Sequence, residues 1–184
     1  GSRFEYYDDL YLDNGFSVYS EKLSTSSKAS TSIKQQEGSY FDTFFNYTLD
    51  YDKRNQKYQT TDGYRSKFTQ KIPLINKSNT LTNEYDYKMY SEWWSENIAS
   101  LSFYITSSNS MSGKDVKLSD RLFLPTNKLR GFEAGKFGPK DGLEFIGGNY
   151  ASAFNLSTTL PQVLPSLQNI DISLYFDAAN VWGV

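Results

Sequence analysis

Hydrophobic and polar residues alternate along most of this chain with a period of two residues. We interpret each alternating segment as a β-strand, because successive side chains of a strand point to opposite faces of a sheet. The clearest segment covers residues 40–52, where Phe41, Phe45 and Leu49 alternate with Asp42 and Asp50. No segment has a convincing helical period. Seven strands are expected, at residues 10–23, 40–52, 64–74, 81–90, 98–106, 148–160 and 170–182.

The first strand leaves two interpretations open. Asn14-Gly15 is typical of a two-residue hairpin turn, which would break the strand there. The alternation keeps its phase across this dipeptide, however, and favours a single strand entered by a turn at Asp8-Asp9. Residues 1–7 would then be the end of an earlier strand. Residues 24–38 are rich in Ser, Thr, Lys and Gln without any period, which predicts a mobile loop.

Consecutive strands joined by turns predict an all-β antiparallel meander, and the strand lengths favour a membrane barrel over a soluble sandwich. Strands of soluble sandwiches are typically about 5–6 residues long, whereas a strand that crosses a membrane needs roughly 9–11. Charged residues such as Asp50, Lys67 and Asp86 lie in mid-strand on the polar face, where they need the water of a barrel lumen. The opposite, lipid-facing side is expected to carry Phe45, Phe68, Leu101, Phe154 and Leu174.

The direction of successive strands predicts which connections share a side of the membrane. Residues 24–38 are expected outside the cell, and residues 53–62, Trp93-Trp94 and residues 161–168 in the periplasm. Tryptophan favours the headgroup level, so we interpret Trp93-Trp94 as an interface anchor at a turn, with a partner-binding patch as the alternative. On the polar face, strand 40–52 is acidic, strand 64–74 basic and strand 81–90 mostly acidic. This pattern favours a solvated stabilising face, and an ion-selective pore is the second interpretation.

Residues 107–146 form a connection too long for an ordinary turn. Connections of this length are usually functional or disordered. The segment is apolar enough to need something to pack against, and it holds one conspicuous cation, Arg130, followed by Gly131 and Phe132. We therefore expect it to fold back onto the barrel.

The composition excludes several classes of function. The 184 residues include no histidine and no cysteine, which removes the commonest general base, thiolate metal ligands and disulfides. A formal net charge of −2 argues against nucleic-acid binding. No apolar run is long enough for a transmembrane helix. We expect neither an enzyme nor a bound metal or cofactor.

Four motifs in the second half of the chain, taken in order, resemble the outer-membrane assembly-factor superfamily, which includes the insertases and the two-partner-secretion transporters. The resemblance is strongest to the BamA-like branch, in a form like that of alphaproteobacteria. The motifs are Asp120-Arg121-x-Phe123-Leu124, Leu129-Arg130-Gly131-Phe132-Glu133-x-Gly135-x-x-Gly138-Pro139, Gly147-Gly148-Asn149 and Phe176-Asp177-Ala178-x-x-Val181-Trp182.

This resemblance implies a partial barrel domain over residues 1–184, belonging to a barrel of about 16 strands whose closing strands and N-terminal POTRA domains lie outside this chain. It also implies that the long loop folds into the lumen, where Arg130, Gly131 and Phe132 dock on Tyr175 and Asp177. The alternation independently places Tyr175 and Asp177 on the lumen side. The loop is expected to depend further on Gly135, Gly138, Pro139, Gly147, Gly148 and Asn149.

The chain departs from the family pattern at three places. The family commonly has Glu where Ser157 stands, Gly where Ala179 stands and Gly-Gly where Pro125-Thr126 stands. The loss of a carboxylate at position 157 predicts that Asp177 is the principal carboxylate partner of Arg130.

The function that the resemblance implies is insertion of β-barrel proteins into the bacterial outer membrane, without a cofactor and without enzymatic chemistry. Its expected partners are unfolded outer-membrane clients, outer-membrane lipids and lipopolysaccharide, with assembly lipoproteins bound through regions outside this chain. A TamA-like or two-partner-secretion transporter is the alternative within the superfamily. A diffusion porin and a soluble carbohydrate-binding sandwich are alternatives from other classes.

Overall fold

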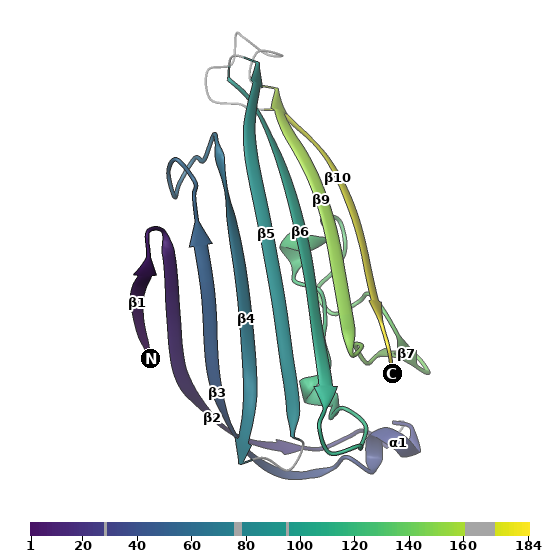
Figure 1. Ribbon diagram of the computed structural model, residues 1–184. Helices are drawn as coiled ribbons and strands as arrows, with labels where there is room; N and C mark the ends of the chain where they lie inside the picture. Colours follow the sequence, from purple (N-terminus) through teal and green to yellow (C-terminus); the bar gives the residue numbers. More distant parts are fainter. Residues whose placement is uncertain (28, 76–78, 95, 161–171) are drawn as a thin grey trace.

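The computed structural model describes residues 1–27, 29–75, 79–94, 96–160 and 172–184. Its main feature is a curved antiparallel sheet in which eight strands follow one another in chain order (Figure 1). The first and last strands form the two edges, so the sheet is open. The strands are β1 (Ser2–Tyr7), β2 (Leu10–Leu23), β3 (Gly38–Asp52), β4 (Gly63–Ile75), β5 (Thr80–Trp94), β6 (Asn97–Ser110), β9 (Tyr150–Leu160) and β10 (Ile172–Trp182).

The meander predicted from the alternation is confirmed, with differences at the strand ends. Strand β5 continues through Trp94, so Trp93 and Trp94 end a strand and do not form the turn. Strand β9 begins at Tyr150, two residues later than expected. The predicted start of the last strand at residues 170–171 and the predicted connection at 161–168 lie outside the described residues.

The interpretation of the first strand is also settled by the register. Ser2 pairs with Asn14, and Gly15 pairs with Asn46 of β3, so Asn14-Gly15 lies inside strand β2. A hairpin turn at this dipeptide is therefore wrong. The chain turns at Asp8-Asp9 instead, where Asp9 has a φ of 63°, and the segment before it forms the edge strand β1.

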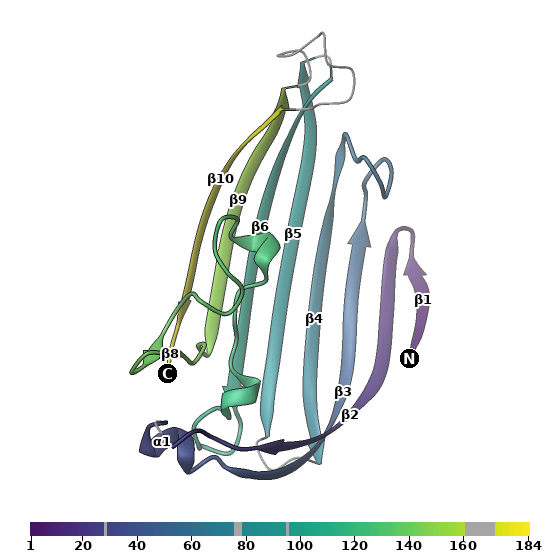
Figure 2. The ribbon, with the colours of Figure 1, turned by 180° about the vertical axis from the view of Figure 1, so that it is seen from behind.

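The two faces of the sheet differ as the alternation predicts. The long loop lies against the concave face (Figure 2), and there Phe44, Tyr104, Ala151 and Ala153 are buried. The residues predicted to face lipid have the opposite phase, and Leu174 is 59% exposed. On this outer face an aromatic row crosses three strands, with neighbouring ring centroids 5.4–6.4 Å apart, through Phe16, Phe45, Tyr47 and Phe68.

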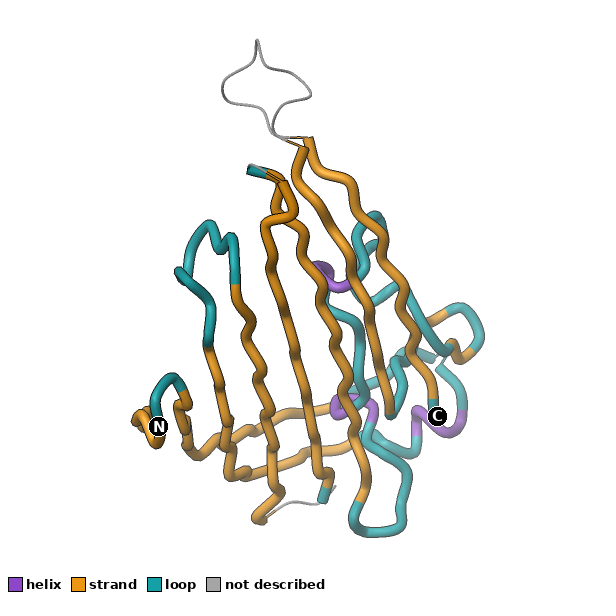
Figure 3. Tube along the Cα trace, turned by 45° about the horizontal axis from the view of Figure 1, so that its top comes forward, coloured by secondary structure: helices purple, strands orange, loops and turns teal. Residues whose placement is uncertain are grey.

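Helix is confined to short pieces within the loops (Figure 3). The segment between β2 and β3 contains α1 (Thr31–Lys34), where the sequence predicts only irregular, mobile chain. A single helical turn is too short to produce a helical period, and it starts because Ser30 accepts a hydrogen bond from the Ile33 amide. In the described residues, no helix is long and apolar enough to cross a membrane.

The sheet determines which loops lie at the same end of the strands, and labelling in cells tests which end faces outward. The loop before β3 and the long loop after β6 share one end, and the β3–β4 turn lies at the other (Figure 1). In the intact protein, we expect a cysteine at Ser27 to react with a membrane-impermeant maleimide on intact cells. A cysteine at Lys57 should react only after the outer membrane is permeabilised. The chain has no native cysteine to interfere, and the reverse pattern would show that the topology is inverted.

Candidate functional site

The candidate site is the long connection between β6 and β9, residues 111–149, which returns into the concave side of the sheet (Figure 2). It is shifted from the predicted 107–146 because β6 continues to Ser110 and β9 starts at Tyr150. It contains two single-turn 3₁₀ helices, η1 (Leu118–Asp120) and η2 (Thr126–Lys128), and a small hairpin of β7 (Lys140–Asp141) and β8 (Glu144–Phe145). The loop is thus a folded element that rests on the lumen wall.

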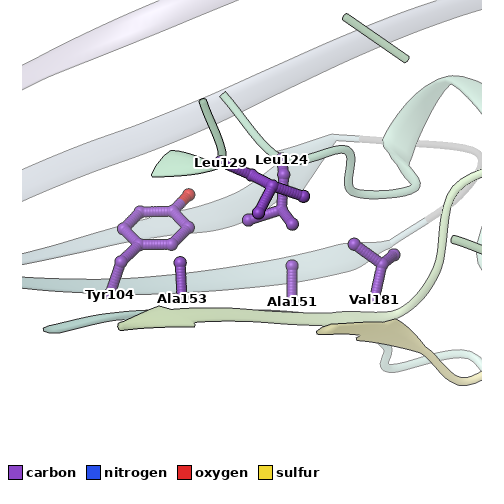
Figure 4. Packing of buried hydrophobic residues seen from close by; sticks show 6 residues of the cluster. All are labelled: Tyr104, Leu124, Leu129, Ala151, Ala153 and Val181. Carbon is purple, nitrogen blue, oxygen red and sulfur yellow. The ribbon is translucent and has the colours of Figure 1, made fainter. Parts of the chain in front are cut away.

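A small apolar cluster seats the loop on the wall (Figure 4). Leu124 and Leu129 of the loop pack on Ala151 and Ala153 of β9, with Tyr104 beside them. The two alanines have short side chains, which leaves room for the leucines against the strand. Burying a leucine side chain stabilises by about 1.5–3 kcal/mol, so the two leucines together outweigh one ordinary hydrogen bond.

Arg130 lies beyond this cluster and binds Asp177 of β10. Its Nε is 2.7 Å from Oδ2 and its Nη2 is 2.5 Å from Oδ1, which is the bidentate arrangement of a guanidinium on a carboxylate. The backbone amide of Arg130 donates a further hydrogen bond of 3.0 Å to Asp177. The ring of Tyr175 lies under the guanidinium, 3.9 Å from Cζ to the centroid. The contact predicted from the motif is therefore present, with its carboxylate side chain 4% exposed.

Gly131 follows with a φ of 84°, a conformation that glycine adopts without strain. The sharp change of direction here lets the chain leave the wall directly after Arg130. The hydrogen bonds to Asp177 also raise the pKa of Arg130 against the opposing effect of burial, so the guanidinium remains charged in the lumen.

Asn155 completes the binding of Asp177, and the sequence reasoning missed it. Its Nδ2 donates to Asp177 Oδ1 and to the carbonyl oxygen of Lys128, each at 2.9 Å. Asn155 and Asp177 are direct partners in the β9–β10 register. The sequence could have predicted this contact, because the alternation places Asn155 and Asp177 on the lumen side of two adjacent strands. Ser157, two residues on, bonds instead to Ser100.

The resemblance predicts that Phe132 docks on the wall together with Arg130, and the ring contact given for Phe132 lies within the loop. Its ring stacks edge to face on Phe137, with centroids 5.6 Å apart, and 54% of the residue stays exposed. The Phe132–Phe137 contact lies within the loop, and Phe137 also packs against the apolar cluster that seats the loop on the wall.

The other predicted loop residues hold the loop's base and flank. Gly138 packs so close to β10 that an added Cβ would lie 2.8 Å from Val181 Cβ. Gly148 bonds in both directions with the backbone of Leu122, which joins the two ends of the loop. The Asn149 amide donates to the Gly183 carbonyl, and Pro139 accepts from Ile146. Gly135 and Gly147 both have positive φ, 72° and 68°.

Lys128 gives the loop tip a second ionic contact that the sequence reasoning did not name. Its Nζ lies 2.7 Å from Asp86 Oδ2 on β5 and 4.9 Å from the ring centroid of Tyr104. Tyr104 in turn donates a hydrogen bond to Glu84. The loop tip therefore contacts both β5 and β10, on either side of the β6–β9 pair.

Lys117 fastens the start of the loop, and the sequence reasoning missed this residue too. Its ammonium lies 2.7 Å from Asp42 and 2.5 Å from Glu21, and only 5% of its side chain is exposed. Burial alone lowers the pKa of Lys117, but the hydrogen bonds with Asp42 and Glu21 outweigh it and leave the pKa raised. Nearby, the Leu118 amide donates to Gln36, so the α1 segment is tied to the long loop.

The described residues contain no cluster of three or more Asp, Glu, His or Cys side chains placed to hold a metal ion. The contacts that hold the loop are ion pairs, hydrogen bonds and apolar contacts. Such a site can fix or release a loop.

Replacing either partner of the Arg130–Asp177 pair should destabilise the docked loop. In a double-mutant cycle in the intact protein, we expect Arg130→Ala and Asp177→Ala to be strongly non-additive, with a coupling of about 1.5–3 kcal/mol in the free energy of barrel unfolding. Arg130→Lys should lose part of that coupling, because an ammonium cannot bind the carboxylate bidentately and stack on Tyr175 at once. If the destabilisations caused by Arg130→Ala and Asp177→Ala simply add in the double variant, the two residues do not stabilise the docked loop as a pair.

A second prediction concerns Lys117. Lys117→Ala would remove the buried ammonium that binds both Asp42 and Glu21, and breaking a buried pair costs about 3–5 kcal/mol. The matched control is Lys114→Ala, an exposed lysine of the same loop, which should change stability by less than about 0.5 kcal/mol. Urea unfolding in detergent measures the difference in stability between the two variants. Equal urea midpoints would refute the role of Lys117 in fastening the loop.

Known proteins resemble this chain in fold and in part of the sequence. The crystal structure of BamA from Haemophilus ducreyi lacking POTRA domains 1–3 superimposes with a TM-score of 0.85 over 98% of this chain and 40% of that one, at 21% identity. A SAM50-like protein of Schizosaccharomyces pombe is 41% identical over 63 residues, which are 34% of this chain and 13% of that protein. This chain thus spans less than half the length of either.

The match to a protein-family domain covers more of this chain than the match to the SAM50-like protein. The Omp85 superfamily domain matches residues 2–184, which is nearly the full chain. The match includes the sheet and the whole of the docked loop. The chain therefore belongs to the Omp85 superfamily of outer-membrane β-barrel proteins.

Proposed function

We propose that this chain is part of the barrel of a bacterial outer-membrane insertase, which folds other β-barrel proteins and inserts them into the membrane. The observation that carries the proposal is the loop held in the lumen by Arg130 and Asp177, in a sheet that resembles the barrel of BamA. The work requires no covalent chemistry. The chain contributes a rigid wall and a fixed loop, and client strands would pair at sheet edges elsewhere in the barrel.

The wall and the loop have different tasks in this mechanism. The long strands present aromatic residues to lipid on the outer face and polar residues to the lumen, so the outer face of the wall is suited to a membrane. The loop crosses several strands on the inner face and ties β5 to β10 through Lys128 and Arg130. If an edge of the barrel opens for a client strand, these loop contacts would keep the strands from β5 to β10 in place.

The expected partners follow from these surfaces. The outer face meets outer-membrane lipids and lipopolysaccharide. Unfolded barrel proteins are the clients, and assembly lipoproteins bind through regions outside this chain. A TamA-like or two-partner-secretion transporter is the alternative, since the loop motif also fits those members of the superfamily.

Reconstitution of the intact protein tests the proposal. Proteoliposomes that contain it should accelerate the folding of a urea-denatured β-barrel client over empty liposomes, measured by the heat-modifiable mobility of the client on gels. Arg130→Ala should slow this by about tenfold, the factor that a loss of about 1.4 kcal/mol produces. The matched control is Lys136→Ala, which removes an exposed loop cation that pairs with Glu133 of the same loop.

Two results would contradict the proposal. Client folding at the rate of empty liposomes would remove the insertase function. Passage of a polypeptide into the liposome without membrane insertion would assign the chain to a transporter instead.

A further inference from the structure

A polar cavity of about 550 Å³ lies between the loop tip and the wall, and the docking contacts do not fill it. Residues of β4, β5, β6 and β9 form its wall, and the loop contributes Asn127, Lys128 and Arg130. The lining is strongly basic. One carboxylate, Asp86, faces six cations, which are Arg54, Arg65, Lys67, Lys88, Lys128 and Arg130.

Four of these six cations are already neutralised by a carboxylate. The pairs have N–O distances of 2.5–2.7 Å and are Arg54–Asp52, Arg65–Asp50, Lys128–Asp86 and Arg130–Asp177. Lys67 and Lys88 form no ion pair with any other described residue. Among the described residues, the cavity therefore has a surplus of two positive charges.

The sheet register explains why Lys67 forms no ion pair with the described residues. It lies directly between Asp50 of β3 and Asp86 of β5, which would be its natural partners. Asp50 is held by both Arg65 and Arg3 and is 1% exposed. Asp86 is held by Lys128 from the loop. Docking of the loop thus uses the carboxylate that Lys67 would otherwise bind.

Lys88 has no acidic neighbour at all in the register. It lies opposite Arg65 on β4 and opposite Ser102 on β6. Like charges directly opposed on neighbouring strands are destabilising. The contact given for the Lys88 ammonium is with the ring of Tyr90, 5.0 Å from the centroid. Ser102 lines the same cavity, and its hydroxyl makes no hydrogen bond to another described residue, so the hydroxyl is available as a donor.

We propose that this cavity binds an oxyanion of the phosphate class, with Lys67 and Lys88 as its principal ligands. A phosphate group carries nearly two negative charges at neutral pH and several acceptor oxygens, which matches two unpaired ammonium groups and a free hydroxyl. A monovalent anion would neutralise only one of the two surplus positive charges. The cavity is larger than inorganic phosphate, so a larger molecule bearing a phosphate group also fits.

An anion in this position would contact the wall and the loop together. Lys67, Lys88 and Ser102 belong to the wall, whereas Lys128 and Arg130 belong to the loop. A ligand that binds only the docked arrangement stabilises it by mass action. The site would therefore couple the anion to the position of the loop. This inference rests on the docked loop and not on the insertase function.

Calorimetric titration of the intact protein with inorganic phosphate tests the site. The protein is held in a zwitterionic detergent without anionic lipid, so that any response belongs to the free anion. We expect Lys67→Gln and Lys88→Gln each to weaken phosphate binding by about tenfold, as for the loss of one charge-assisted hydrogen bond. The matched control is Lys71→Gln, on the same strand and face but outside the cavity, with its ammonium 3.7 Å from the ring centroid of Phe44. It should bind phosphate like the wild type.

Two further measurements keep the result decisive. Phosphate should raise the thermal unfolding temperature of the wild-type protein above that in chloride at equal ionic strength. The Lys67→Arg/Lys88→Arg variant, which keeps both charges, should retain this rise even if the glutamine variants fail to fold. If phosphate and chloride change the unfolding temperature of the wild type equally, the change is due to screening of charges by salt, and the proposed site is wrong. Phosphate binding that is unchanged in a folded Lys67→Gln/Lys88→Gln variant would also overturn it.

Discussion

A single buried carboxylate, Asp177, is the group on which the arrangement of loop and wall depends. It accepts hydrogen bonds from Arg130 Nε, Arg130 Nη2, the Arg130 amide and Asn155 Nδ2. With 4% of its side chain exposed, it would be costly to leave ionised without these donors. Three of the four come from the loop. The wall therefore needs the loop in place as much as the loop needs the wall.

The rest of the wall is suited to this contact by its small residues. Ala151 and Ala153 on β9 give the loop access to the strand surface, and Leu124 and Leu129 fill the space above them (Figure 4). Because apolar burial has no preferred direction, these leucines alone would not fix the position of the loop along the strands. The ion pairs supply that direction. Arg130 fixes the tip on β10, Lys128 on β5, and Lys117 fixes the start of the loop over β2 and β3.

The sequence predicted the sheet well because one simple rule, alternation, acts along every strand. Even the phase of Tyr175 and Asp177 followed from it, and the motif identified Arg130 as their partner. The contacts missed were those that depend on two strands and a loop at once. Asn155 and Lys128 looked like ordinary polar residues until the register placed them beside Asp177 and Asp86. The α1 turn, four residues long, carries no detectable period.

The departure at position 157 connects the lock to the charge of the lumen. The resemblance of the motifs to the family implies Glu there, whereas here Ser157 bonds to Ser100 and lines the basic cavity. A carboxylate at this position would reduce the cavity's surplus of two positive charges to one. Its absence leaves Arg130 with one carboxylate partner and leaves Lys67 and Lys88 without compensation from the described residues. Serine at this position thus leaves Asp177 as the carboxylate partner of Arg130 and leaves the cavity beneath this pair attractive to an anion.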